Sequence, residues 1–561
     1  MKSRSFFSAL ALAVVILLVV GAGGAYWLAS SSPLGGKASP IGMPSAAIFM
    51  SKRSPIVASF LGNPDRLISG GLAFTPPTQR RAMQIEFKRF QESFLAETHL
   101  NYSHDIQPWV GDEMTWAFTA TDLDRDSDNG QQPGYLVAIA TDKPEQARES
   151  LDKFWQKRVS KGADLVVEQF VGVPIVHASE SLASAVVGDR FVLLANHPKV
   201  LRDALNNAQA PDLNLSNSKT YQQFTENLPA ESLGLTVINL PQLATALGDS
   251  LPLNLLYDRL VMTLKLDPQG LLADATLLST TGTTATKITQ PALSAPVEAL
   301  KFIPKGLVTA AGKNVKQVLA QLETGLVGYD AIATRLQQPI AQLEKKWDIS
   351  LSEDVLSWMP GEYALGMLPR SDGASQGAPD WVFVTRQSTE TTTGLERLNA
   401  IAQAQDISLG SVPLGETKIT AWTTLQTVPK PRASSQKNAE SELMTIQAKV
   451  EGVHATVNEY EIFATSLEAM EQAIQAAQTP VVDDRRGAIA ALAPRNNGYL
   501  FVDGSTLQKW VRSLASISEN SPQDIAKKMQ LLLNHVASAT LSNYGSDAQG
   551  QHNGILIQLK K

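Results

Sequence analysis

Cysteine is absent from the sequence. Its absence excludes disulfide bonds, iron–sulfur clusters, thiol nucleophiles, cysteine-ligated zinc and an N-terminal lipoprotein anchor. Dense basic tracts are absent as well, and 48 basic against 54 acidic side chains give a formal net charge of −6, which argues against a nucleic-acid-binding protein. The chain has 561 residues, of which 43% are hydrophobic and 18% charged. This composition is typical of globular domains and excludes disorder throughout.

Long apolar runs are scarce, which excludes a polytopic membrane protein. One such run, Phe6–Leu28, contains no charge, and as a helix it would be roughly 34 Å long, enough to cross a membrane. Lys2 and Arg4 precede it, and Lys37 is the next charge. The positive-inside rule therefore predicts a cytoplasmic N-terminus (1–5), a transmembrane signal-anchor (6–28) and a body beyond the membrane. The small residues at 23–25 leave a second interpretation open, a cleaved signal peptide.

Beyond a serine- and glycine-rich flexible linker at 29–42, landmarks recur in the same order. Asp105, Trp109 and Glu113, four residues apart, recur as Asp354, Trp358 and Glu362. Predicted helices at 199–209 and 468–478 each follow a short apolar strand, and a further apolar strand is expected at 498–503. We interpret this order as an ancient duplication, although two unrelated segments could also align. The predicted repeat lobes are 43–280 and 297–561, joined by an inter-lobe linker at 281–296, with a mobile polar insertion at 427–442 in the second.

Strands that adjoin strands, with helices between them, predict an α+β fold. We expect an N-terminal transmembrane helix followed by two duplicated lobes with largely antiparallel or mixed sheets and packed helices. An amphipathic helix is expected at 79–98, where Phe87, Phe90 and Phe94 share one face. That face could pack on the core or lie on a membrane surface. The repeated stripe in the second lobe favours core packing.

Several of these landmarks carry a resemblance. The Asp-x-x-x-Trp-x-x-x-Glu segments, the strand-to-helix step at 140–147 and the Gly-Val-Pro-Ile segment at 172–175 resemble a mainly cyanobacterial family known as domain of unknown function 3352. The resemblance covers nearly everything after the anchor. It implies a cyanobacterial source and a periplasmic or thylakoid-lumenal body, and it brings no established activity and no catalytic residue.

The densest acidic cluster is a weak calcium candidate, formed by Asp122, Asp124, Asp126 and Asp128. Alternating carboxylates suit a hard cation, but the spacing of a calcium loop is not kept: Tyr135 stands where a bidentate glutamate is required. A solvated hairpin tip is the favoured interpretation.

The six repeated landmark residues are the other candidates, as ligand-binding or structural pairs. In each set, two carboxylates flank an aromatic side chain, an arrangement that could serve acid–base chemistry on a glycan. The structural alternative is favoured. In it, Asp105 and Asp354 accept backbone N–H groups at the start of a short helix, and the tryptophans fill the core.

The other matches to catalytic and cofactor-binding motifs are incomplete. Gly306–Asn314 resembles a phosphate loop but ends in asparagine where serine or threonine is needed. Ser216-x-x-Lys219 and Ser434-x-x-Lys437 match the first element of penicillin-binding enzymes and Ser127-Asp128-Asn129 matches the second, but the second precedes the first and no Lys-Thr-Gly follows. The seven histidines form no His-x-x-x-His pair. We therefore predict no catalytic residue, no cofactor and no firm metal site.

The leading hypothesis is a membrane-anchored, non-enzymatic binding, scaffold or assembly factor with a protein partner in or near the membrane and no nucleic-acid partner. The first alternative is a carrier of a lipid, pigment or other hydrophobic ligand, walled by the alternating strands at 261–266 and 553–559. The second alternative is a hydrolase of envelope polymers, for which no nucleophile and base are evident.

Overall fold

The computed structural model describes residues 44–62, 102–124, 126, 132–178, 182–229, 231–246, 255–267, 269–280, 293–315, 344–345, 349–359, 361–369, 379–429, 444–478, 484–515 and 536–560. The predicted anchor at 6–28, the linker at 29–42 and the amphipathic helix at 79–98 lie outside these residues, as do most of the inter-lobe linker and of the insertion. Among the described residues, no helix is both long and apolar enough to cross a membrane.

Among the described strands, ten belong to each half of the chain. The first half holds β1 (Ile56–Leu61), β2 (Val110–Ala120), β3 (Gly134–Thr141), β4 (Leu165–Phe170), β5 (Val173–Ala178), β6 (Ala183–Val187), β7 (Phe191–Ala195), β8 (Ser232–Asn239), β9 (Tyr257–Asp267) and β10 (Gly270–Ser279). The second half holds β11 (Val308–Gly312), β12 (Tyr363–Leu368), β13 (Asp380–Arg386), β14 (Ser408–Leu414), β15 (Thr417–Pro429), β16 (Met444–Val457), β17 (Tyr460–Ala464), β18 (Gly498–Asp503), β19 (Val536–Ser546) and β20 (Gly550–Leu559).

Helices connect and cover these strands. The described α-helices are α4 (Pro144–Val159), α5 (Pro198–Gln209), α6 (Lys219–Glu226), α7 (Leu240–Ala246), α10 (Thr389–Ala404), α11 (Leu467–Gln478), α12 (Asp484–Ala491) and α13 (Gly504–Ala515). Short helical turns are η1 (Ala46–Phe49), η2 (Tyr102–Ile106), η3 (Leu215–Asn217), η4 (Glu298–Phe302), η5 (Leu351–Val355) and η6 (Leu356–Trp358).

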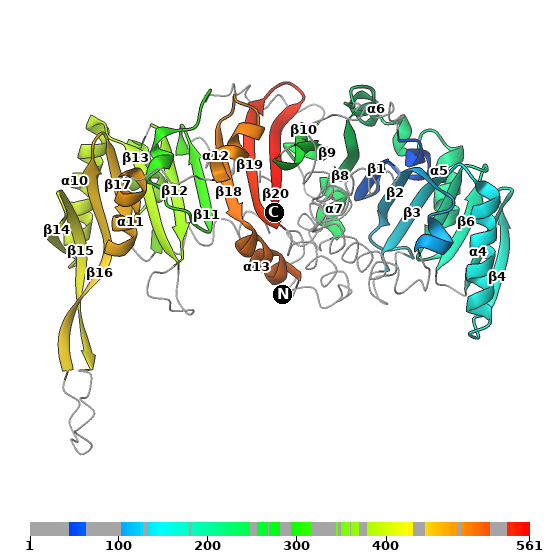
Figure 1. The fold of residues 1–561 in the computed structure, drawn as a ribbon, viewed down its shortest axis with the longest axis horizontal. Helices are drawn as coiled ribbons and strands as arrows, with labels where there is room; N and C mark the ends of the chain where they lie inside the picture. Colours follow the sequence, from blue (N-terminus) through cyan, green and yellow to red (C-terminus); the bar gives the residue numbers. More distant parts are fainter. Residues whose placement is uncertain are drawn as a thin grey trace, which may run out of the picture.

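The described strands form one 20-stranded sheet in which every pairing is antiparallel. Following the pairings, the first half runs β4-β5-β6-β7-β3-β2-β1-β8-β9-β10. The second half runs β14-β15-β16-β17-β13-β12-β11-β18-β19-β20. The two series have the same order, and β10 pairs with β20 where they meet (Figure 1). The mixture of helices and a largely antiparallel sheet was predicted, whereas the joining of the halves into a single sheet was not.

Each half has its own core. In the first half, α5 buries Val200, Leu201, Ala204 and Leu205 against the sheet. In the second half, α11 buries Ala469, Met470, Ala473 and Ile474. Both helices thus bury positions i, i+1, i+4 and i+5, the spacing of one helical face. The main hydrophobic clusters of the two halves share no residue.

A long hairpin departs from this regular arrangement. We define the arm as residues 424–429 of β15 and 444–451 of β16, which project from the body at the end of the second half (Figure 1). The predicted insertion at 427–442 begins inside β15, because its first residues, Thr427 and Val428, are β-branched and continue the ladder opposite Ile446 and Thr445. Residues 430–442 lie outside the described part of the chain.

Candidate functional site

The first landmark set lies where η2 leads into β2. Trp109 is 3% exposed, and its indole Nε1 donates to the backbone oxygen of Asp105 at 2.5 Å. Asp105 is the fourth residue of η2, so it does not begin the helix as expected. The indole bond uses its carbonyl group, and the Trp109 ring packs with Ile106 and Leu151 in a small hydrophobic cluster.

The second set repeats this geometry. Trp358 donates from Nε1 to the backbone oxygen of Asp354 at 2.6 Å, and Asp354 is the fourth residue of η5. The Asp354 carboxylate pairs with Arg397 at 2.5 Å and accepts the backbone N–H of Ser350 at 2.8 Å. These contacts join η5 to α10 and to the segment before it.

The two glutamates have different partners. Glu113 lies at the N-terminal end of η1 and accepts hydrogen bonds from Ser45 N and Oγ at 2.8 and 2.7 Å and from Ala46 N at 2.8 Å. Glu362 instead accepts the hydroxyl of Tyr460 at 2.5 Å. Burial, and then the bond to Glu362, raises the pKa of Tyr460. Both carboxylates bind donors from their own chain, which favours the structural alternative over acid–base chemistry.

The acidic cluster lies at the turn between β2 and β3. Asp122 Oδ1 accepts the backbone N–H of Gln132 at 3.2 Å, and Asp124 Oδ1 accepts that of Asp126 at 3.1 Å. Asp128 lies outside the described residues. Within the part of the chain that the structure describes, no three His, Asp or Glu side chains are placed to hold a metal ion.

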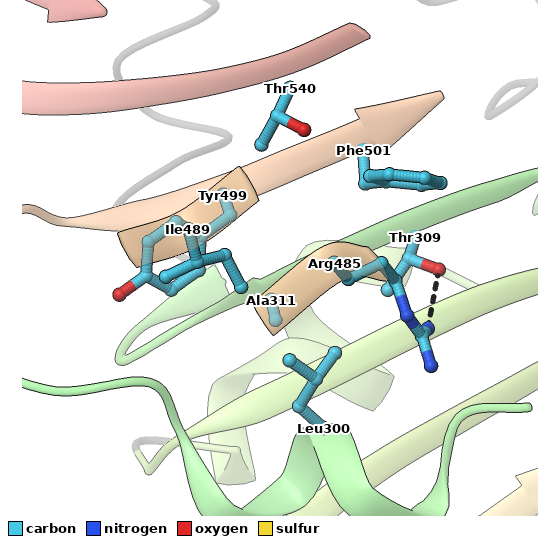
Figure 2. A pocket seen from close by; sticks show the side chains of 8 residues that line it. All are labelled: Leu300, Thr309, Ala311, Arg485, Ile489, Tyr499, Phe501 and Thr540. Carbon is cyan, nitrogen blue, oxygen red and sulfur yellow. Dashed lines mark hydrogen bonds between the residues drawn. The ribbon is translucent and has the colours of Figure 1, made fainter. Parts of the chain in front are cut away.

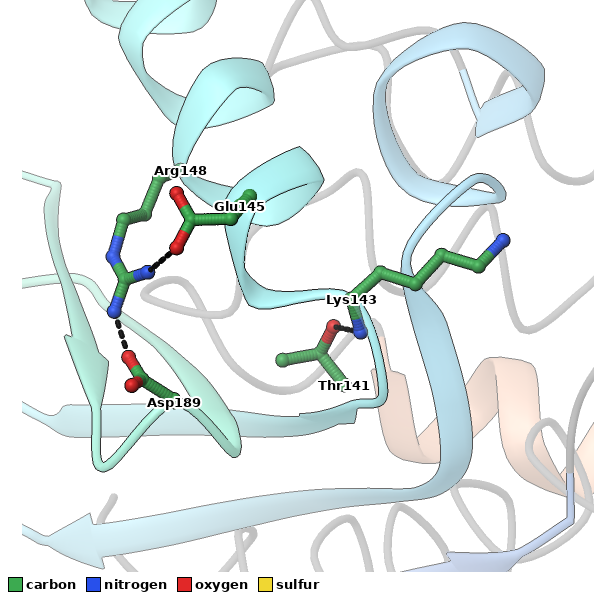
Figure 3. A network of polar contacts seen from close by, with 5 residues as sticks. All are labelled: Thr141, Lys143, Glu145, Arg148 and Asp189. Carbon is green, nitrogen blue, oxygen red and sulfur yellow. Dashed lines mark hydrogen bonds and ion pairs between the residues drawn. The ribbon is translucent and has the colours of Figure 1, made fainter.

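The strand-to-helix step at 140–147 has contacts that hold the chain in place (Figure 3). Thr141 donates its hydroxyl to the backbone oxygen of Trp109 at 2.7 Å and accepts the N–H of Lys143 at 3.1 Å. Arg148 pairs with Glu145 at 2.8 Å and also with Asp189. Such exposed ion pairs stabilise a fold by at most about 1 kcal/mol. The hydrogen bonds of Thr141, and not these ion pairs, hold the end of β3 beside Trp109.

The structure also contains a buried polar cluster that no pattern in the sequence predicted. His454 Nδ1 lies 2.8 Å from Glu461 Oε1, and Thr456 donates to Glu461 Oε2 at 2.7 Å. Glu461 is fully buried and His454 is 9% exposed. The imidazole packs against Trp422 and Phe463, at ring-centroid distances of 5.1 and 5.9 Å, and these two rings also pack against each other at 6.4 Å. Its Nε2 atom has no hydrogen-bond partner among the described residues.

This cluster is specific to the second half. By strand register, the positions of Thr456 and Glu461 correspond to Val186 and Val192, which pair in the same way between β6 and β7. A carboxylate that orients an imidazole is part of many hydrolytic sites. Here the imidazole is buried against two aromatic rings, and one of them, Trp422, donates to Asn399 of α10, which favours a structural role. The sequence signal that could have brought these residues together is Asn458, because asparagine tolerates the positive φ of a hairpin turn, here 55°.

A small pocket lies between η4, α12 and strands β11, β18 and β19 (Figure 2). Arg485 donates to Thr309 Oγ1 at 3.0 Å and to the backbone oxygen of Ile303 at 2.8 Å. The centre of a water molecule can reach about 10 Å³ inside it, which is room for about one water. A lipid or pigment does not fit a space of this size, so the pocket gives the carrier hypothesis no support.

Comparisons with known proteins match nearly the whole chain to one family model. The model described as "Protein of unknown function (DUF3352)" matches residues 10–559. No curated protein matches the sequence. Among solved structures, crystal form I of TP0453 has a TM-score of 0.26 and 10% identity, covering 45% of this chain and 83% of that one. Crystal form III has a TM-score of 0.24 and 11% identity, covering 44% and 84%. Similarity at this level assigns neither fold nor function.

Proposed function

The chain belongs to the DUF3352 family of proteins of unknown function, and we propose that it is a membrane-anchored extracytoplasmic scaffold that binds a partner protein rather than catalysing a reaction. The observation that carries this proposal is the arm. Its Leu425 and Ile446 side chains are 73% and 71% exposed. Large apolar side chains so exposed on a projecting element are typical of interaction surfaces.

The arm has one apolar face. Leu425 pairs with Ala448, and Thr427 pairs with Ile446. Because alternate residues of a strand point to the same side, Leu425, Ile446 and Ala448 share a face. Gln426 and Gln447, which pair with each other, lie on the opposite face. The side chains of Leu425, Ile446 and Ala448 are all exposed, so this apolar face is available to a partner.

The edges of the arm favour a protein partner over a lipid. Pairing of β14 with β15 ends at Ser408 and Thr423, and pairing of β17 with β16 ends at Ala464 and Val453. Among the described strands, none pairs with the outer edges of the arm beyond these points. Free strand edges present N–H and C=O groups that another strand can satisfy, whereas hydrocarbon cannot. A two-stranded ribbon is also marginally stable alone.

We further propose that the apolar run at 6–28 anchors the chain and that its body lies in the periplasm or thylakoid lumen. The common strand order of the two halves supports an origin by duplication. The arm would then be an addition to the second copy, because β5 and β6 at the corresponding place are short.

Photocrosslinking tests the proposal. A benzoylphenylalanine at Ile446 in the full-length chain, expressed in its native membranes, is expected to give a discrete protein adduct. The same probe at Gln447, on the opposite face, serves as the matched control. Replacing Leu425 with aspartate should reduce the adduct at position 446. Lipid adducts alone, or equal adducts at both positions, would contradict docking of a protein on this face.

A further inference from the structure

The junction between the halves is a ladder between β10 and β20. We call this ladder the seam. Its register runs from Leu271 opposite Ile557 to Leu278 opposite Gly550. In this register, Asp274 lies opposite Gly554.

The seam has the geometry of a two-fold interface. The turns before β10 and β20 end at Gly270 and Gly550, with φ of 151° and 159°. A Cβ on Gly270 would lie 2.1 Å from the backbone oxygen of Ile557, and a Cβ on Gly550 would lie 1.9 Å from that of Leu277. The two glycines are 280 positions apart, as are Leu277 and Ile557. The contact of Gly270 with Ile557 and the contact of Gly550 with Leu277 are therefore equivalent under a two-fold rotation.

The local axis passes between Asp274 and Gly554, which are also 280 positions apart. An interface with such an axis is isologous, the kind that two identical subunits form. Its geometry would equally accept β10 of a second copy in place of β20. In that ladder, Asp274 would lie opposite another Asp274.

Like charges directly opposite in a ladder destabilise it. In the native seam, Asp274 pairs with Lys265 of β9 at 2.9 Å, and the residue opposite it across the ladder, Gly554, has no side chain. Gly554 leaves room for Tyr544, because a Cβ there would lie 1.8 Å from the Tyr544 hydroxyl. The two strands thus differ at the axis: β10 carries a charge, and β20 carries none.

We infer that Asp274 is a specificity residue of the seam, which directs β10 to pair with β20 and not with β10 of a second copy. The first half is synthesised before β20, and its edge strand is then open to other chains. The first half closes its main core without the second, so the open edge would belong to a largely packed unit. A charge on the axis disfavours the wrong pairing at that stage.

Refolding of the full-length chain tests this inference. The protein is unfolded in urea, diluted over a range of chain concentrations, and analysed by size exclusion with light scattering. Asp274→Asn is expected to raise the dimer fraction roughly fivefold, the equivalent of the upper range for a like-charge pair. Asp267→Asn, at the end of β9 in the same hairpin, should leave it unchanged. An unchanged dimer fraction in Asp274→Asn would overturn the inference.

A second measurement reads the register of the dimer. Because the chain has no cysteine, Asp274→Cys introduces a single thiol that faces itself only in a β10–β10 ladder centred on the axis. A short thiol-to-thiol crosslinker should then join two chains. Ala275→Cys, which would face Ala273 in that ladder, should crosslink much less. Equal crosslinking of the two variants, or none in refolded Asp274→Cys, would show that β10 does not pair with itself in this register.

Discussion

The indole ring of Trp358 occupies the space in which a Cβ on Gly394 would lie, with Cδ2 at 2.1 Å from that position. The glycine lets α10 approach the ring directly. Alanine is the better helix former by about 1 kcal/mol, but relieving this overlap would displace a buried side chain at a cost of about 1–3 kcal/mol or more.

Gly394→Ala is therefore expected to lower the free energy of unfolding, by about 1–2 kcal/mol net, as measured by urea denaturation. Thr393→Ala, at an exposed neighbouring position of α10, is the control and should raise stability slightly. A Gly394→Ala variant as stable as the control would show that the ring moves aside freely.

Replacing Thr540, in contrast to Gly394, is expected to raise the free energy of unfolding. Its side chain is fully buried, and its hydroxyl has no hydrogen-bond partner among the described residues. By strand register, its position corresponds to Val261 of the first half, since Phe501 pairs with Thr540 as Val237 pairs with Val261. Thr540→Val should stabilise the protein by about 1 kcal/mol.

The control for Thr540 is Thr309→Val, in the same pocket. Thr309 accepts a hydrogen bond from the buried Arg485, so its loss should destabilise the protein by about 1–3 kcal/mol. Thermal unfolding of the two variants should thus show shifts of opposite sign. Shifts of the same sign would contradict the assignment of the unpartnered hydroxyl.

The cap of α13 predicts a pH dependence. Burial alone would raise the pKa of Asp503, but hydrogen bonds from Ser505 and Thr506 outweigh it and lower that pKa. Since the folded pKa is below the unfolded value of about 3.9, the stabilisation is present above that value and disappears as the pH falls through the folded pKa. Asp503→Ala should cost about 1 kcal/mol at pH 7.

Denaturation curves recorded between pH 7 and pH 2 test the cap. The stability difference between wild type and Asp503→Ala should shrink as the pH falls below about 4. Asp380→Ala, which removes a half-buried carboxylate that accepts the Thr465 hydroxyl at 2.8 Å, controls for the general loss of charge. A difference that stayed constant with pH would exclude the charged cap.

The buried cluster predicts strong coupling between His454 and Glu461. Each single replacement by leucine leaves a buried polar group of the other residue unpaired, at about 3 kcal/mol. The double variant should cost less than the sum, with a coupling energy of about 1–3 kcal/mol. A double-mutant cycle by urea denaturation measures it, and additive costs would show that the two residues act independently.

Local pattern was enough to predict individual elements. The helix expected at 199–209 is α5, and the strand expected at 498–503 is β18. The helix has the apolar spacing of one helical face, and the strand is a short apolar run bounded by Gly498 and Asp503. The antiparallel α+β character followed from the same patterns.

Contacts between segments far apart along the chain could not be predicted from the sequence. Glu113 and Glu362 have the same spacing from their tryptophans, yet Glu113 binds Ser45 and Glu362 binds Tyr460. The partners come from elements far along the chain, so no local pattern distinguishes a capping carboxylate from a reactive one. The pairing of β10 with β20 was missed for the same reason, because strand edges carry no sequence signal for their partner.

The seam also determines on which face of the joined sheet equivalent elements of the two halves lie. An axis between antiparallel neighbours runs perpendicular to the sheet, so it relates α5 and α11 as elements on the same face. A partner that itself has two copies of a complementary surface could engage both halves at once, and the second contact would form at the high effective concentration of an intramolecular step. For such a partner, the joined sheet would turn two separate contacts into one bivalent attachment.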